Sequence, residues 1–101
     1  MSVSIVTYGE IYEGVLFSRR PAESEASFLN FLRYADVLPL DEALMRRFAG
    51  LRGSLRKKGE KMADPDLIIA ATALHHDLTL VTRNLKHFTR IPALKLHPIP
   101  E

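Results

Sequence analysis

The 101-residue chain contains no cysteine. Disulfide bonds, thiolate metal ligands and a cysteine nucleophile are therefore excluded, and a reducing, cytoplasmic setting is favoured. The chain also has no apolar run that approaches the roughly 20 residues of a membrane-spanning helix. Its N-terminus carries neither the basic region nor the apolar core of a signal peptide. We therefore predict a cytoplasmic protein that does not interact with membranes.

A strong excess of one charge is missing as well. Fourteen basic residues oppose twelve acidic ones, and the net charge of +2 is too small to indicate nucleic-acid binding by itself. The basic residues are nevertheless concentrated in one stretch, and this run either forms a solvated helix face or contacts a phosphate backbone. Its members are Arg46, Arg47, Arg52, Arg56, Lys57, Lys58 and Lys61.

Hydrophobic residues make up 47% of the chain, which is ample for one core, so we expect a single domain over residues 1–101. Hydrophobic periodicity and turn signals predict helices that alternate with short strands. Such an order is typical of an α/β fold, with a short parallel sheet whose functional edge is the carboxyl end of its strands. The predicted helices cover 4–18, 21–34, 42–58 and 65–76, with a helical turn at 84–88, and the predicted strands cover 37–40, 78–82 and 95–99.

Two acids precede the most apolar of these helices, in "MADPDLIIAATAL". Asp64 stands directly before Pro65, which predicts that its side chain caps the helix and that proline takes the first helical position. Asp66 lies within the first turn, where the helix dipole favours negative charge. Because apolar residues follow it at once, Asp66 is alternatively an acid that faces a cleft.

Glu10 is the third acid of interest, in "TYGEIYEG". It lies between Ile5 and Ile11 on the first predicted helix, beside a glycine. Two carboxylates from different helices repel each other unless a cation joins them. Sites built only from oxygen ligands suit Mg²⁺ or Mn²⁺. Glu10 and Asp66 are therefore candidates for a shared metal site.

The motifs "TYGEIYEG", "DLIIAATAL", "LTLVTRNLKHF" and "RIPALKL" resemble, in this order and spacing, the PIN domain, and specifically the VapC-type toxins of toxin–antitoxin pairs. The resemblance covers nearly the whole chain. It implies a ribonuclease in which acids hold Mg²⁺ or Mn²⁺, a VapB-type antitoxin as partner, and a homodimer. An apolar surface on the first two helices is then a candidate seat for an antitoxin peptide.

The resemblance assigns roles to individual residues. Glu10 and Asp66 match catalytic, metal-binding acids of the family, and Asn84 matches a polar residue beside the ligands. Arg83 is a weaker candidate for contact with phosphate. Where relatives often carry an acid this chain has His87, which either ligates a metal or faces phosphate. The basic residues Arg52, Arg56 and Lys57 become candidates for contact with the RNA backbone.

The chain also departs from the family pattern at its N-terminus. Relatives begin with a strand that ends in an aspartate, and we expect this chain to lack that central first strand and its catalytic acid. Three hypotheses remain: a VapC-like ribonuclease, a non-catalytic PIN-like remnant that binds antitoxin or RNA, and an unrelated basic interaction module. The last would leave Glu10 and Asp66 more than about 10 Å apart, too far to share a metal pair.

Overall fold

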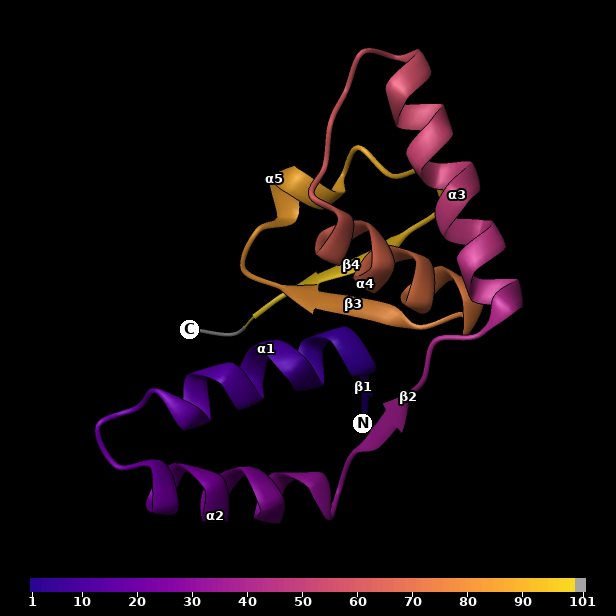
Figure 1. The fold of residues 1–101 in the computed structure, drawn as a ribbon. Helices are drawn as coiled ribbons and strands as arrows, with labels where there is room; N and C mark the ends of the chain where they lie inside the picture. Colours follow the sequence, from indigo (N-terminus) through magenta and orange to yellow (C-terminus); the bar gives the residue numbers. More distant parts are fainter. Residues whose placement is uncertain (100–101) are drawn as a thin grey trace. The chain divides into compact units, whose positions relative to one another are not determined.

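Short parallel strands alternate with helices along the chain (Figure 1). The computed structural model describes residues 1–99 and divides into two units, Met1–Leu40 and Asp41–Glu101. The predicted α/β class is confirmed, while the single domain over residues 1–101 stays a prediction. None of the helices within residues 1–99 has the length and apolarity needed to cross a membrane.

The first unit consists of a strand pair connected by two helices. Its elements are β1 (Ser2–Ser4), α1 (Ile5–Leu16), α2 (Pro21–Leu32) and β2 (Asp36–Leu38). The strands are parallel, with Val3 opposite Val37. The sequence did not predict β1, which ends where a helix was expected to begin. The predicted cap of that helix is confirmed, because Ser4 Oγ accepts a hydrogen bond of 3.0 Å from the Val6 amide.

Aromatic side chains fill the interior of the first unit. Phe28 on α2 is 5% exposed. Its ring centroid lies 5.1 Å from that of Tyr8 and 6.1 Å from that of Tyr12, both on α1, and 6.3 Å from that of Phe31. Edge-on and offset contacts at these distances stabilise aromatic pairs beyond the area they bury. This cluster joins α1 to α2.

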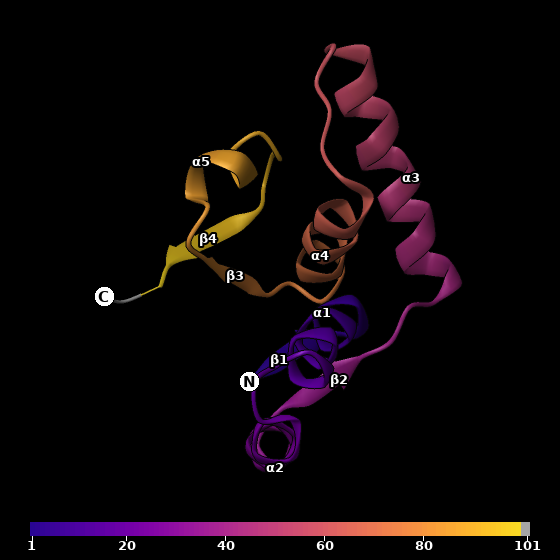
Figure 2. The same cartoon turned by 60° about the vertical axis from the view of Figure 1, so that its left-hand side comes forward.

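The second unit contains the longest helix and the other strand pair. Its elements are α3 (Glu42–Lys57), α4 (Asp64–His75), β3 (Thr79–Thr82), α5 (Leu85–Phe88) and β4 (Lys95–Pro98). Strands β3 and β4 are parallel, with Leu80 opposite Leu96, and α5 lies in the connection between them (Figure 2). The sequence predicted all five elements, with bounds that differ by at most one residue at either end.

Helix α4 is the most deeply buried element of this unit. Leu67 is 1% exposed, and Ala70 and Ala71 are inaccessible. The alanines allow close approach, and α3 packs against α4. The core around them contains Leu55, Met62, Leu67, Ala70, Phe88 and Ile91. No residue from Asp66 to His75 is fully exposed, which explains why the sequence of α4 shows an almost continuous apolar run.

Local signals explain how α3 begins and ends. Asp41 Oδ1 accepts a hydrogen bond of 2.7 Å from the Leu44 amide, which confirms the predicted cap. Gly59 has a φ of +72°, and the amides of Gly59 and Glu60 donate to the carbonyls of Arg56 and Leu55. These two bonds form a Schellman motif, in which a glycine carries the left-handed conformation. The predicted end of the helix at Gly59 is therefore confirmed.

The predicted cap of α4 is wrong. Ala63 occupies the N-cap position, and no side chain caps the helix. Asp64 lies inside the first turn, where its Oδ1 accepts a hydrogen bond of 3.0 Å from Arg52 Nε on α3. An ion pair with a neighbouring helix thus takes the place of a local bond to the backbone. Pro65 still lies in the first turn, where its missing amide costs no helical hydrogen bond.

Candidate nuclease site

The side chains of Asp66 and His87 meet at the first turn of α4. Asp66 Oδ2 lies 3.2 Å from Nε2 of His87, which belongs to α5. The side chains are 37% and 26% exposed, respectively, so they border solvent without being fully hydrated. The buried face of α4 holds Asp66 in place, because Leu67 anchors the same turn in the core. The sequence predicted that His87 ligates a metal or faces phosphate. The structure instead shows His87 in contact with Asp66.

Arg90 completes this arrangement. Its Nη2 lies 3.0 Å from Nδ1 of His87, and its Nε donates a hydrogen bond of 3.1 Å to the His87 carbonyl. Its Nη1 donates a hydrogen bond of 2.8 Å to the carbonyl of Lys61 in the loop before α4. The sequence analysis missed Arg90. No helical pattern marked it, because α5 ends at Phe88 and Arg90 lies in the turn that follows.

Asp66 retains an oxygen that could bind a cation. Within residues 1–99 only Oδ2 of its carboxylate has a hydrogen-bond partner. Across the same part of the chain, no group of three His, Asp or Glu side chains is assembled to hold a metal. Mg²⁺ usually keeps several waters and binds one or two carboxylates together with substrate phosphates. The donor chemistry of Asp66 fits such an ion.

The other predicted site residues are exposed. Glu10 lies on α1 in the first unit and Asp66 in the second, and their convergence remains a prediction. Asn84 and Arg83 lie between β3 and α5. The Asn84 amide donates a hydrogen bond of 3.0 Å to Thr82 Oγ1, which fixes the turn that presents both side chains. This turn follows the carboxyl end of β3, the edge at which functional groups of parallel sheets gather.

The basic residues of α3 do not form one uniform surface. Arg52 pairs with Asp64, whereas Arg56 and Lys57 are exposed and form no ion pair with the described residues. A pocket of about 470 Å³ lies at this end of α3, lined partly by Arg52, Arg56 and Lys61. Its floor is apolar, because Leu55, Met62 and Leu67 contribute to it. Arg56 and Lys57 are therefore better placed than Arg52 to bind an external anion.

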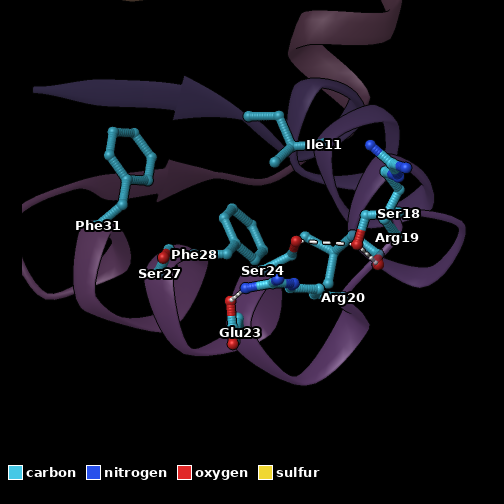
Figure 3. A pocket seen from close by; sticks show the side chains of 10 residues that line it. Ile11, Ser18, Arg19, Arg20, Glu23, Ser24, Ser27, Phe28 and Phe31 are labelled. Atoms are coloured by element: carbon cyan, nitrogen blue, oxygen red, sulfur yellow. Dashed lines mark hydrogen bonds and ion pairs between the residues drawn. The ribbon is translucent and has the colours of Figure 1, made fainter.

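A larger groove lies between α1 and α2 in the first unit (Figure 3). It measures about 1090 Å³, and Phe28 and Phe31 form part of its apolar lining together with Ile11. Polar groups surround these side chains: Ser18 and Ser24 hydrogen bond to each other at 2.8 Å. The full lining is Ile11, Val15, Ser18, Arg19, Arg20, Glu23, Ser24, Ser27, Phe28 and Phe31.

Short parallel strands joined by helices define an α/β protein, and the restrained carboxylate of Asp66 gives it a candidate site for a divalent cation. Residues 1–94 match the PIN domain family, and the chain therefore belongs to this family. Its relatives are VapC ribonucleases. Ribonuclease VapC2 of Haemophilus influenzae is 33% identical over 95 residues, a match that covers 94% of this chain and 72% of the relative. The tRNA(fMet)-specific endonuclease VapC of Salmonella typhimurium is 30% identical over 96 residues, covering 95% and 73%.

Solved structures give the same relationship. DNA-bound VapBC from Salmonella typhimurium matches with a TM-score of 0.91 and 30% identity, over 97% of this chain and 74% of the other. VapBC2 from Rickettsia felis, bound to a promoter DNA fragment, matches with a TM-score of 0.89 and 30% identity, over 96% and 73%. The predicted resemblance to VapC-type PIN domains is thereby confirmed. Nucleases of this family generally depend on divalent metal ions.

Proposed function

We propose that this chain is the toxin ribonuclease of a toxin–antitoxin pair and cleaves RNA phosphodiester bonds. Its metal would be Mg²⁺ or Mn²⁺, held by Glu10 and Asp66. The observation that carries the proposal is the geometry of Asp66, whose Oδ2 is held by His87 while Oδ1 has no partner among the described residues. The ribonuclease activity in the names of its relatives supports the same assignment.

The proposed chemistry separates the part of the ion from that of the chain. A bound divalent ion lowers the pKa of a water for attack on the phosphodiester and balances the charge that develops. Asp66 and Glu10 would supply carboxylate oxygens from two helices. Arg83 and Asn84, exposed on the turn after β3, would contact the phosphate or hold the ligands in place. Arg56 and Lys57, with a smaller contribution from Arg52, would bind the RNA backbone without base specificity.

The groove between α1 and α2 is the proposed binding surface for a VapB-type antitoxin. Its lining combines apolar side chains with a charged end, where Arg20 Nη1 lies 3.4 Å from Glu23 Oε2 (Figure 3). An amphipathic helix would bury its apolar face on Ile11 and Phe31, which are more exposed than Phe28. A solved relative from Mycobacterium tuberculosis is a member of the VapBC family of toxin–antitoxin systems, which supports a partner of this kind. A homodimer and a cytoplasmic location complete the proposal.

The competing function is a PIN-domain protein without catalysis that binds antitoxin or RNA. One observation favours it: where an acid would enlarge a metal site, the chain has His87, and both ring nitrogens of His87 contact other side chains. This alternative predicts RNA binding without cleavage. It also predicts that Mn²⁺ has no effect on the integrity of an RNA substrate.

Removing the charge of Asp66 distinguishes the two functions. Asp66→Asn should reduce cleavage of a pool of structured RNAs in Mg²⁺ or Mn²⁺ by at least about 100-fold, because asparagine keeps the shape but loses the anionic ligand. Gel analysis of RNA incubated with each ion, and with EDTA, measures this. Asp64→Asn is the matched control and should retain activity. RNA that stays intact but bound would support the competing function.

A further inference from the structure

Both ring nitrogens of His87 have partners, and the partners determine which nitrogen carries the proton. Nδ1 faces the Arg90 guanidinium at 3.0 Å, and a guanidinium has only donors. Nδ1 must therefore accept a hydrogen bond. Nε2 faces Oδ2 of Asp66 at 3.2 Å, and an aspartate carboxylate only accepts. A single neutral tautomer, with its proton on Nε2, satisfies both contacts.

The imidazole of His87 is oriented by Arg90, whose own side chain is restrained by hydrogen bonds. Two of the hydrogen bonds of Arg90 go to backbone carbonyls, those of His87 and Lys61. The Lys61 carbonyl belongs to the loop before α4, and the His87 carbonyl belongs to α5. Arg90 thus joins the two segments that carry Asp66 and His87. Because the carbonyls restrain the guanidinium plane, the ring of His87 is held in one orientation.

We propose that His87 and Arg90 are positioning residues for Asp66. His87 donates its Nε2 proton to Oδ2, fixes the carboxylate rotamer and leaves Oδ1 directed away to bind a divalent cation. This inference rests on the proposed function, since the cation is the one that Asp66 would bind there. It also excludes His87 as a metal ligand, because Nε2 is protonated and the Nδ1 lone pair points at Arg90.

A hydrogen bond of this kind has a measurable effect on metal binding. Groups that orient a ligand without touching the metal typically change metal affinity by about 10- to 100-fold when they are removed. An unrestrained aspartate in the first turn of α4 would lose rotamer freedom on binding the ion, whereas Asp66 has already lost it. Removing the hydrogen bond from His87 should therefore weaken the binding of a divalent ion by Asp66, even when no RNA is cleaved.

The test measures Mn²⁺ binding to the full chain by isothermal titration calorimetry, without RNA. His87→Ala should weaken Mn²⁺ binding by about 10- to 100-fold. His87→Gln should restore most of it, because the glutamine amide can donate from near the position of Nε2. His76→Ala is the matched control: it removes an exposed histidine at the end of α4 and should leave affinity unchanged. Thermal unfolding of each variant checks that it is folded.

A second measurement reports on the tautomer directly. In ¹⁵N NMR spectra of the chain, His87 should show a protonated Nε2 and an unprotonated Nδ1, and Arg90→Ala should allow a mixture of the two tautomers. A proton on Nδ1 in the unmodified chain overturns the proposal, even if His87→Ala fails to fold.

The outcomes separate this inference from the proposed function. If His87→Ala binds Mn²⁺ as well as the unmodified chain, while Asp66→Asn abolishes binding, the positioning role is wrong and the metal site stands. If Asp66→Asn also leaves binding unchanged, the metal site itself is wrong. A chain that binds no Mn²⁺ overturns both.

Discussion

Replacing Arg56 and Lys57 by alanine tests whether α3 contacts the RNA backbone. Both side chains are exposed and form no ion pair with the described residues, so each is available to a phosphate. Each phosphate contact contributes about 0.7 to the slope of log K against log salt concentration for a single strand. The double variant should therefore lower this slope by about 1.4. If the electrostatic contribution vanishes near 1 M salt, the double variant should bind RNA at 0.1 M salt about 25-fold more weakly than the unmodified chain.

The structure also predicts that Arg52 behaves differently. Its Nε lies 3.0 Å from Asp64 Oδ1, so a phosphate would have to compete with a carboxylate for the same guanidinium. Arg52→Ala should lower the slope by less than about 0.7. The loss of this exposed ion pair should cost at most about 1 kcal/mol of unfolding free energy.

Fluorescence anisotropy with a labelled RNA, titrated at several KCl concentrations in EDTA, measures both slopes without cleavage. Lys95→Ala is the control, because Lys95 Nζ pairs with Asp77 Oδ1 at 3.0 Å on another part of the unit. An unchanged slope in the double variant would mean that the basic residues of α3 only solvate the helix. A larger effect of Arg52→Ala than of the double variant would refute the argument from ion pairing.

Two further predictions concern the groove and a strained turn. Ile11→Asp places a charge in the α1–α2 groove and should weaken binding of the co-purified cognate antitoxin at least about 10-fold, as measured by calorimetry. Leu29→Asp, which lies outside the groove, is the control and should leave binding unchanged. Equal effects of the two substitutions would place the antitoxin elsewhere. Ala93 has a φ of +66°, so Ala93→Gly should raise the unfolding free energy, measured by urea unfolding, by about 0.5 to 1 kcal/mol. Ala49→Gly in α3 is the control and should lower the unfolding free energy by about 1 kcal/mol. A lower unfolding free energy in both variants would show that the backbone at Ala93 is not strained.

Features that depend on neighbouring residues could be predicted from the sequence. The caps at Ser4 and Asp41 and the glycine at the end of α3 follow from bonds that span a few residues. Strand β1 was missed because its only apolar residue, Val3, lies between two serines, so no hydrophobic run marks the strand. The left-handed backbone of Asp77, which follows α4 with a φ of +53°, has no glycine to signal it in the sequence, although glycine adopts this conformation at lower cost.

The site was predicted only in part, because its contacts join distant segments. Asp66 was a candidate from its place before an apolar helix, but its partner His87 is 21 residues away in the sequence. The partner of Asp64, Arg52, is 12 residues away, and this contact replaced the predicted cap. Such pairs depend on how α3, α4 and α5 pack, which no local pattern specifies.

The two acids at the start of α4 show why the kind of partner matters. Two residues along a helix correspond to a rotation of about 200°, so Asp64 and Asp66 point to opposite sides. Asp64 pairs directly with Arg52, whose positive charge offsets its own. A guanidinium in the same position beside Asp66 could bind both carboxylate oxygens and compete with a cation. Instead, the His87 ring lies between Arg90 and Asp66. The neutral imidazole holds one oxygen, and the charge of Asp66 and its second oxygen stay available for a metal ion.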